Sequence, residues 1–245
     1  MKTIFIITKK ELRSFFSSAT GYIVLAIFFV GSALFLWVFP NQYNVLDSGY
    51  ASLDGLFALA PMLFLFLCSA ITMRLFAEEN QQGTLEMLFA RPVSKLSLVL
   101  GKALSGWLLV IIALIGTLVW YFSIKMLAVP VGNVDSGAFW GSFIGLLLLS
   151  CVYVSIGVFA SSIAGNQVVA FMISAVLCFA FFIGFNFVGA LFSNGATSQF
   201  ISSIGIDYHY KSISRGVIDS RDLLYFLVVS AIFLFFSKII LEKQR

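Results

Sequence analysis

The chain has 245 residues, of which 60% are apolar and 11% charged, and its formal net charge is +4 at pH 7. Ordinary globular domains carry roughly 25% charged residues, so this composition excludes a soluble globular protein and predicts an integral membrane protein. The three cysteines, Cys68, Cys151 and Cys178, all lie in apolar runs. Their odd number and their spacing provide neither a disulfide framework nor a CxxC metal site, and we expect them to pack as small apolar side chains.

Residues 1–19 predict an amphipathic helix rather than a cleaved signal peptide, because no small-residue cleavage site follows the first apolar run. Most apolar residues fall within an arc of about 120° on a helical projection, with the cations on its flank and back, while Ile6 and Ile7 lie outside the arc. We expect this helix to lie in the membrane interface with its cations at the headgroups. The predicted interfacial residues are Phe5, Lys9, Lys10, Leu12, Arg13, Phe15 and Phe16.

Six apolar runs are each close to the ~20 residues that a helix needs to cross a bilayer. They lie at about 20–39, 56–77, 99–124, 139–162, 168–192 and 223–241. Each must be a helix, because lipid satisfies no backbone hydrogen bonds. The predicted fold is therefore a single all-α polytopic membrane domain, 1–245. Four cations stand near span ends, where a long side chain can snorkel to the interface: Arg74, Lys102, Lys125 and Lys238.

The positions of lysine and arginine indicate which side of the membrane each region faces. Eleven of the fifteen lie in the N-terminal segment, residues 74–102 and the C-terminal tail. Six alternating helices place these three regions on one side, and cytoplasmic loops carry an excess of Lys and Arg. We therefore expect both termini and residues 74–102 to be cytoplasmic.

The segment from Arg74 to Lys102 is the one large polar stretch between two apolar runs, and it holds three of the eleven acidic residues and four of the fifteen basic ones. Within it, Gly83 interrupts a polar run, Thr84 is a good helix N-cap and Pro92 disfavours helix at the residue before it. These signals predict a short helix of about seven residues, roughly 10 Å long, between Thr84 and Pro92.

One face of this short helix is apolar and is expected to be exposed. Leu85, Leu88 and Phe89 stand at positions i, i+3 and i+4, and Glu86 and Arg91 border them. The helix either folds back onto the headgroups as a plain interfacial loop or inserts as a knob into a groove on a partner. Anionic membrane surfaces attract basic helices, whereas three glutamates lie nearby, so a protein partner is the favoured interpretation.

Small residues in spans four and five predict close helix packing. Gly141 and Gly145 form a GxxxG pattern in span four, and Ala170 and Ser174 lie on one face of span five. Ordinary packing within the chain is favoured, and a subunit interface is the alternative. The turn between these spans, at residues 165–167, is very short, so the two spans form a tight antiparallel hairpin.

Residues 193–222 form the largest piece predicted on the opposite side of the membrane. Thirty residues without structure would be unusual, so we expect one or two short helices there that dip back into the outer leaflet. The segment holds the one histidine of the chain, His209, close to Asp207. A metal site needs several ligands, and we expect none here.

No motif in the chain predicts catalysis. A P-loop needs GxxxxGK[ST], but Leu96 stands at the first glycine position and Ala103 follows Lys102. Ion-driven transporters usually place ionisable groups at mid-membrane, and no span has a carboxylate near its centre. Asn186 is the nearest candidate, and a neutral amide more often makes a helix–helix hydrogen bond. We expect a chain that is not an enzyme, holds no cofactor or metal and takes its energy from elsewhere.

The block from Ala77 to Lys102, AEENQQGTLEMLFARPVSKLSLVLGK, resembles the signature of permease subunits of type-2 ABC exporters, E-E-x-x-x-G-T-L-E-x-L-x-x-x-P-V-S followed by L-G-K. The stretches KKELRSFFSSATGYIVL and SISRGVIDSRDLLYF are similar to the branch associated with bacterial gliding motility. Related permeases for copper-enzyme maturation share much of this pattern.

The resemblance implies six transmembrane helices, an N-terminal interfacial helix, a short cytoplasmic coupling helix between spans 2 and 3, and re-entrant outer helices at about 200–216. It also implies that the coupling helix docks on a separate ATPase subunit, which binds ATP and Mg. Carried onto this sequence, the motif positions are Glu78, Glu79, Gly83, Thr84, Leu85, Glu86, Leu88, Pro92 and Ser94, with Phe89 and Arg91 beside them at the predicted interface.

The function that follows from the resemblance is that of a permease subunit that couples ATP hydrolysis in a partner chain to transport or mechanical work, linked to gliding motility. Its expected partners are the ABC ATPase, a second permease copy or a larger membrane subunit, and the lipid bilayer, but no nucleic acid. The alternatives are a non-transporting membrane anchor of a motility or secretion machine and a permease for copper-enzyme maturation. An ion-driven carrier is disfavoured by the spans without central carboxylates.

Overall fold

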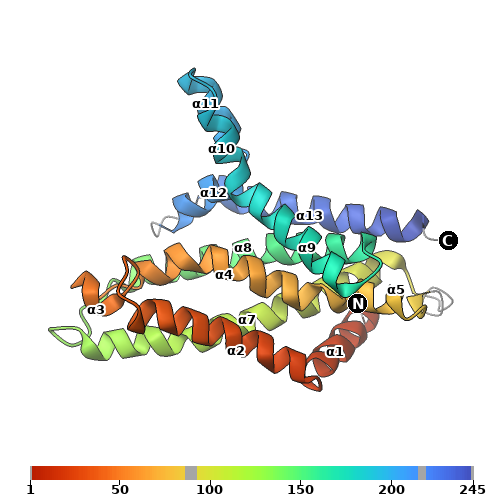
Figure 1. Ribbon diagram of the computed structural model, residues 1–245, viewed down its shortest axis with the longest axis horizontal. Coiled ribbons are helices and arrows are strands. Elements are labelled where there is room, and N and C mark those ends of the chain that lie inside the picture. Colours follow the sequence, from red (N-terminus) through yellow and green to blue (C-terminus); the bar gives the residue numbers. More distant parts are fainter. Residues whose placement is uncertain (1, 86–92, 215–218, 244–245) are drawn as a thin grey trace.

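The computed structural model in Figure 1 describes residues 2–85, 93–214 and 219–243 of the chain. Helices account for 83% of the structure, and these described ranges contain no strand, so the predicted all-α fold is confirmed. Six helical stretches are long and apolar enough to cross a membrane, and their ends differ from the predicted ends by at most four residues. These stretches are Ala19–Val38, Asp54–Gln81, Lys95–Leu127, Ser136–Ile163, Gln167–Ala190 and Ser220–Lys243.

Three of the six spans are composed of more than one helical element. The first joins α2 (Ala19–Ala33) to the π-helical turn η1 (Leu34–Val38), the second joins α4 (Asp54–Thr72) to α5 (Arg74–Gln81), and the fifth joins α9 (Gln167–Phe179), the π-helical turn η2 (Ala180–Gly184) and α10 (Phe185–Ala190). The other three are α7 (Lys95–Leu127), α8 (Ser136–Ile163) and α13 (Ser220–Lys243). The shorter helices outside the spans are α1 (Lys2–Phe16), α3 (Val45–Ser48), α11 (Gly195–Ser202) and α12 (Ile206–Ile213).

The core of the bundle is organised around α8, which packs against α4, α7, α9 and α13. In its most apolar window 72% of the residues are buried, compared with 22% for the first, fifth and sixth spans. Those three spans lie at the periphery and leave large apolar side chains uncovered. An exposed apolar surface on a span is stable when lipid surrounds it, as the composition requires.

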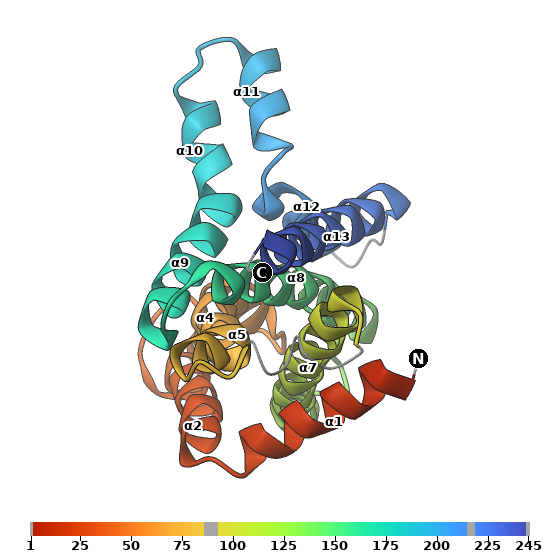
Figure 2. The ribbon, with the colours of Figure 1, turned by 90° about the vertical axis from the view of Figure 1, so that its right-hand side faces the viewer.

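The N-terminal helix α1 lies across one end of the bundle rather than along it. Figure 2 looks along the bundle from this end and shows α1 running crosswise beneath the end of α7, with its outer side free of other elements. α1 packs mainly on α7 and joins α2 at a sharp corner, where Ser17 and Ser18 separate the two helices. A helix with this orientation is suited to the plane of a membrane interface.

The second span is interrupted at Met73, between α4 and α5, and a side chain from α8 forms hydrogen bonds with the backbone around this interruption. α5 has no side-chain cap of its own. The hydroxyl of Ser161 accepts hydrogen bonds from the backbone N–H of Phe76 (2.9 Å) and of Ala77 (3.0 Å), and it donates to the carbonyl of Met73 (3.1 Å). Ser161 therefore satisfies the backbone donors that a helix start leaves unpaired and ties α5 to the central helix.

Replacing Ser161 with alanine should destabilise the chain by about 2 kcal/mol, because two buried N–H groups lose their acceptor. The measurement is the unfolding midpoint of the purified chain in mixed detergent–SDS micelles. Ser123→Ala is the matched control, since the Ser123 hydroxyl donates to the carbonyl of Val119 within its own helix (2.8 Å). Equal midpoints for the two variants would contradict the bridging role of Ser161.

The fifth span bends at η2, and α10 and α11 form a hairpin that extends away from the bundle (Figures 1 and 2). π-helical turns are a recognised cause of sharp bends in helices. Two short helices, α11 and α12, occupy most of the segment for which one or two were predicted. Whether they enter a membrane leaflet stays a prediction.

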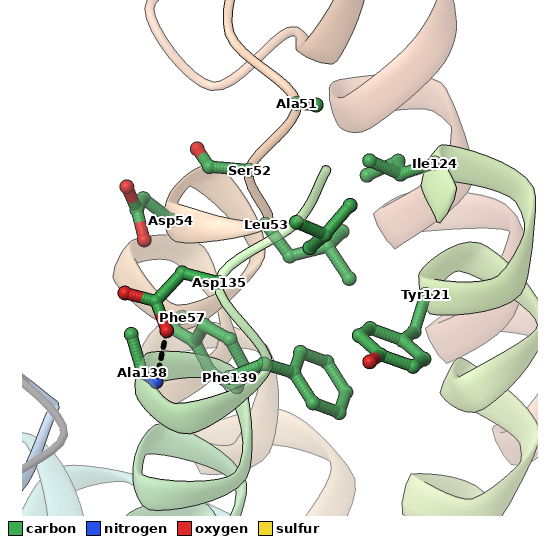
Figure 3. Close-up of a pocket in the computed structure, with 11 residues that line it drawn as sticks. Ala51, Ser52, Leu53, Asp54, Phe57, Tyr121, Ile124, Asp135, Ala138 and Phe139 are labelled. Carbon is green, nitrogen blue, oxygen red and sulfur yellow. Dashed lines mark hydrogen bonds between the residues drawn. The ribbon is translucent and has the colours of Figure 1, made fainter. Parts of the chain in front are cut away.

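At the end of the bundle opposite α1, the ends of α4, α7 and α8 enclose a small cavity of about 140 Å³ (Figure 3). Tyr121 stacks on Phe139 with ring centroids 4.1 Å apart, and Asp135 caps α8 by accepting a hydrogen bond from the N–H of Ala138 (3.0 Å). Ligand pockets usually measure about 300–1,000 Å³. This cavity is therefore too small to serve as a substrate site in the present conformation.

Candidate functional site

The polar stretch that was predicted to meet a partner starts at the end of α5 and returns to the bundle at α7. α5 ends at Gln81, and Gly83 follows with a φ of 67°, a left-handed conformation that glycine adopts most readily. Ser94 caps α7, and its hydroxyl accepts a hydrogen bond from the N–H of Ser97 (3.2 Å). The predicted interruption at Gly83 is confirmed, and the hydroxyl of Thr84 donates to the carbonyl of Glu79 (3.3 Å) at the end of α5.

The predicted short helix falls mostly on residues 86–92, which lie outside the described part of the chain; among them are Glu86, Leu88, Phe89, Arg91 and Pro92. Leu85 is described, and it is only 7% exposed and belongs to the hydrophobic core. The prediction of an exposed apolar face is therefore wrong at Leu85. Of the three apolar residues proposed for that face, Leu88 and Phe89 remain candidates for contact with a partner.

The most concentrated set of charges in the described structure surrounds Lys102 in α7. This residue is 1% exposed, and its ammonium lies 2.7 Å from Oε2 of Glu79 and also donates to the carbonyl of Leu75 in α5. The ammonium stands 4.8 Å from the ring centroid of Phe76, within the range of a cation–π contact. The expectation that Lys102 snorkels is wrong, because its charge is satisfied inside the protein by α5.

Glu11 and Lys10 of α1 complete this cluster. Oε1 of Glu11 lies 3.5 Å from the ammonium of Lys102 and 3.4 Å from that of Lys10, and Lys10 is also 3.4 Å from Oε1 of Glu79. Partial burial lowers the pKa of Lys10, but the carboxylates of Glu11 and Glu79 outweigh it and raise the pKa above its ordinary value. Two carboxylates thus alternate with two ammonium groups, which we call the Lys102 cluster: Lys10, Glu11, Glu79 and Lys102.

Close packing between α1 and α7 brings the Lys102 cluster together. The hydroxyl of Thr8, which is buried, donates to the carbonyl of Gly101 at 2.9 Å. A side chain at Gly101 would place its Cβ 2.9 Å from the Cβ of Ile7, so only glycine lets α1 approach this closely. Gly101 therefore allows α1 to pack closely against α7, and Lys102 next to it forms an ion pair with Glu11 of α1.

The two adjacent glutamates of α5 have different surroundings. Glu79 points into the Lys102 cluster with 16% of its side chain exposed, whereas Glu78 is 36% exposed and pairs with Arg74 at 3.6 Å. Arg74 in turn donates to the hydroxyls of Ser18 (2.9 Å) and Thr20 (3.2 Å), at the corner between α1 and α2. Both glutamates were among the residues predicted at the ATPase interface; Glu79 lies mainly inside the protein, and Glu78 is the more exposed of the two.

The face of α1 that contacts the protein differs from the predicted apolar arc. Phe15 is 3% exposed and packs into the core, while Phe5 is 69% exposed. The buried side instead centres on the polar residues Thr8 and Glu11, with Leu12 and Phe16 half-buried beside them. Lys9 and Arg13 are exposed, as predicted. On a helical projection Phe15 lies within about 20° of Thr8, on the side of α1 that packs against the protein, so the expectation that Phe15 faces the acyl chains is wrong.

The small residues of spans four and five pack within this chain. A Cβ at Gly145 would lie 3.0 Å from Cγ2 of Ile213 in α12, and the hydroxyls of Ser174 and Ser69 are 2.8 Å apart. Gly141 and Ala170 are buried as well. In this structure these residues therefore contact other helices of the same chain, and the alternative of a subunit interface stays a prediction.

A second polar cluster, which the sequence did not predict, joins α12 to α13 and α10. The Nδ1 atom of His209 lies 2.6 Å from Oδ1 of Asp222, and its Nε2 atom lies 2.9 Å from the carbonyl of Ser203. A carboxylate and a carbonyl are both hydrogen-bond acceptors, so each nitrogen of the His209 ring faces an acceptor. Asp207, the other acid, pairs with Lys211 (2.6 Å) and accepts a hydrogen bond from Asn186 (2.7 Å), which confirms the predicted helix–helix role of that amide.

Metal binding finds no support in the geometry of these clusters. Within residues 2–85, 93–214 and 219–243, no group of three or more His, Cys, Asp or Glu side chains could hold a metal ion. His209 and Asp207, the pair considered from the sequence, have separate partners. The contacts of both clusters join helices to one another through ion pairs and hydrogen bonds.

Six apolar spans, five of them arranged around the central α8, with a crosswise amphipathic helix at one end, define a multi-pass helical membrane protein. Residues 5–244, nearly the whole chain, match the family model described as ABC-2 family transporter protein, so the chain belongs to that family. It is a permease subunit of an ABC transporter, a kind of membrane subunit that is typically non-catalytic and works with an ABC ATPase. No curated protein matched the chain.

Proposed function

We propose that this permease transmits ATP-driven movements of its ATPase to the membrane through the segment between Gly83 and Ser94. The observation that carries the proposal is the Lys102 cluster, because it joins the two spans that flank this segment, α5 and α7, to each other and to α1. A displacement of the segment would therefore move three helices together. The cluster lies at the base of the segment, where a partner's force would enter the bundle.

The distribution of charge supports a cytoplasmic location for this end of the protein. α1, α5 and the C-terminal end of α13 lie toward the same end of the bundle in Figure 1, and the three cation-rich regions belong to these elements and the start of α7. By the rule that cytoplasmic loops are rich in Lys and Arg, both termini face the cytoplasm. We place the chain in a bacterial inner (cytoplasmic) membrane because residues 9–25 and 212–226 resemble the branch associated with bacterial gliding motility.

Assembly with a second membrane subunit, either another copy of this permease or a larger chain, completes the proposed transporter. The α10–α11 hairpin supports this part of the proposal, because it carries large apolar side chains with high exposure, including Phe187 (65%), Leu191 (82%) and Phe200 (69%). A link to gliding motility rests on the resemblance of Lys9–Leu25 and Ser212–Phe226 to that branch. A role in copper-enzyme maturation is the alternative within the same class.

Replacing Leu88 and Phe89 together with aspartate should weaken co-purification with the ATPase by about 30-fold or more, since a buried apolar anchor typically contributes about 2 kcal/mol at an interface. Leu85 is left intact because its burial means that a charge there would damage the fold itself. The matched control is the double substitution of Val129 and Val131 with aspartate, which adds the same charges to exposed apolar residues at the other end of α7. Unchanged co-purification of the Leu88/Phe89 variant would refute the proposed contact.

A non-transporting anchor is the second candidate. An anchor and a transporter would both bind the ATPase, but only a transporter would couple ATP turnover to movements of the membrane subunit. Reconstitution of the complex in vesicles should show that the membrane subunit stimulates ATP turnover. In a coupled permease, Glu79→Gln should reduce the stimulation while leaving co-purification intact, because Glu79 lies inside the Lys102 cluster. Absence of stimulation by the unaltered membrane subunit would favour the anchor, whereas full stimulation in the Glu79→Gln variant would mean that coupling does not depend on the Lys102 cluster.

A further inference from the structure

The outer side of α1 carries a shallow, open groove of about 680 Å³ that is formed by residues at successive turns of the helix. Phe5 and Ile6 line one part of it, and the rest is lined by Lys9, Lys10 and Arg13 together with Ser14 and Ser17. We call this set the α1 strip. It faces away from α7, and Figure 2 shows that side of α1 at the edge of the molecule.

The α1 strip is cationic, and its positive charge is not balanced within the groove. No carboxylate lines it, because the one acid of α1, Glu11, turns inward to Lys102 (3.5 Å). In the described part of the chain, Lys9 and Arg13 make no ion pair. Lys10 does pair with Glu11 and Glu79, yet 62% of its side chain remains exposed. The turning of Glu11 therefore leaves a surface with uncompensated positive charge.

The same strip is apolar at its N-terminal part. Phe5 and Ile6 are 69% and 67% exposed, which would be unfavourable in water but is favourable against acyl chains. Cations one turn away from exposed apolar side chains, on a helix lying across the spans, suit a ligand with an anionic head and a hydrocarbon tail. A soluble anion would use only the cations and would leave Phe5 and Ile6 without a role.

From this combination we propose that the α1 strip is a binding site for an anionic phospholipid, whose headgroup phosphate lies at Lys9, Lys10 and Arg13 and whose acyl chains cover Phe5 and Ile6. Each Lys or Arg near an anionic surface contributes about 1 kcal/mol, so the three cations give selectivity for anionic over zwitterionic lipid. The site belongs to this chain alone and does not depend on the ATPase.

The lipid site shares one residue with the Lys102 cluster, and this residue connects lipid binding to coupling. The ammonium of Lys10 lies 3.4 Å from Oε1 of both Glu11 and Glu79. A headgroup phosphate that draws this ammonium outward removes a cation from Glu79, at the base of the proposed coupling segment. This consequence rests on the proposed function, whereas lipid binding itself does not.

The test measures lipid bound to the purified, delipidated full chain in detergent by native mass spectrometry. Phosphatidylglycerol and phosphatidylcholine with the same acyl chains are titrated in parallel. The double variant Lys9→Gln and Arg13→Gln should weaken phosphatidylglycerol binding by about 30-fold, as expected for two lost cations, and should leave phosphatidylcholine binding unchanged. Both side chains are exposed, so the fold should persist, and circular dichroism checks this.

The matched control is Lys125→Gln with Arg221→Gln, which removes one lysine and one arginine from exposed positions outside α1 and should not change lipid binding. Equal affinity for the two lipids, or no effect of the Lys9/Arg13 variant, would overturn the proposal. Displacement of phosphatidylglycerol by millimolar inorganic phosphate would overturn its lipid part and indicate a plain anion site. If the variant lost the ATPase while still binding phosphatidylglycerol, the α1 strip would be a protein interface instead.

Discussion

Replacing Lys102 with methionine should destabilise the chain by about 3–5 kcal/mol, the range observed when one partner of a buried ion pair is removed. Methionine fills a similar volume, so the loss comes from charge: Glu79 and Glu11, whose side chains are 16% and 14% exposed, would keep their negative charges without Lys102. Lys10 remains 3.4 Å from both carboxylates, which places the effect toward the lower end of the range. The measurement is the free energy of unfolding in mixed detergent–SDS micelles.

Two further variants determine whether charge is the cause. Lys238→Met removes a lysine that pairs with Glu242 at 3.5 Å on the exposed side of α13, and it should cost less than about 1 kcal/mol. Adding Glu79→Gln to Lys102→Met should recover part of the lost stability, because one of the uncompensated carboxylates is then neutral. If Lys102→Met were as mild as Lys238→Met, the buried cluster would not hold α1, α5 and α7 together.

The six spans could be predicted from the sequence because each depends on a local property, a run of apolar residues long enough to cross a bilayer. The end of the second span was also readable, because Gly83 lies just past the end of α5. The helices of residues 193–222 were foreseen only in number, since their positions depend on contacts with distant spans. Local sequence patterns thus predict a helix and its ends well where the need to cross the lipid and the backbone geometry determine them.

The Lys102 cluster was not predicted, because it depends on three segments that are distant in the sequence. A lysine near a span end ordinarily snorkels, and nothing in residues 95–127 alone shows that Glu79 and Glu11 approach it. The face of α1 was misassigned for the same reason: Glu11 looks like a surface residue until Lys102 is placed beside it. A usable signal exists, since Lys102 stands two turns into α7, which begins at Lys95, and a cation so far inside a span requires a partner.

The same long-range packing governs the contact between α4 and α8, and Gly157→Ala tests it. A Cβ at Gly157 would lie 2.0 Å from Oγ1 and 2.8 Å from the Cβ of Thr72, which is fully buried at the end of α4. Overpacking in a close-packed interior costs about 1–3 kcal/mol, and here the clash is with a fixed β-branched side chain, so we expect about 3 kcal/mol. Because α4 leads into α5, the separated helices should also loosen the Lys102 cluster and lower ATPase stimulation.

Gly31→Ala is the matched control, because no atom lies within 4 Å of a Cβ at that position in α2. It should be neutral or stabilising by up to about 1 kcal/mol, the usual difference between alanine and glycine inside a helix. The double variant Thr72→Ala with Gly157→Ala should be more stable than the sum of the two single effects, since Oγ1 and Cγ2 of Thr72 are removed and only its Cβ remains close. Additive effects would contradict the close approach of Gly157 to Thr72, where a Cβ would lie 2.0 Å from Oγ1. Gly157 would then have no part in holding the second span against the central helix.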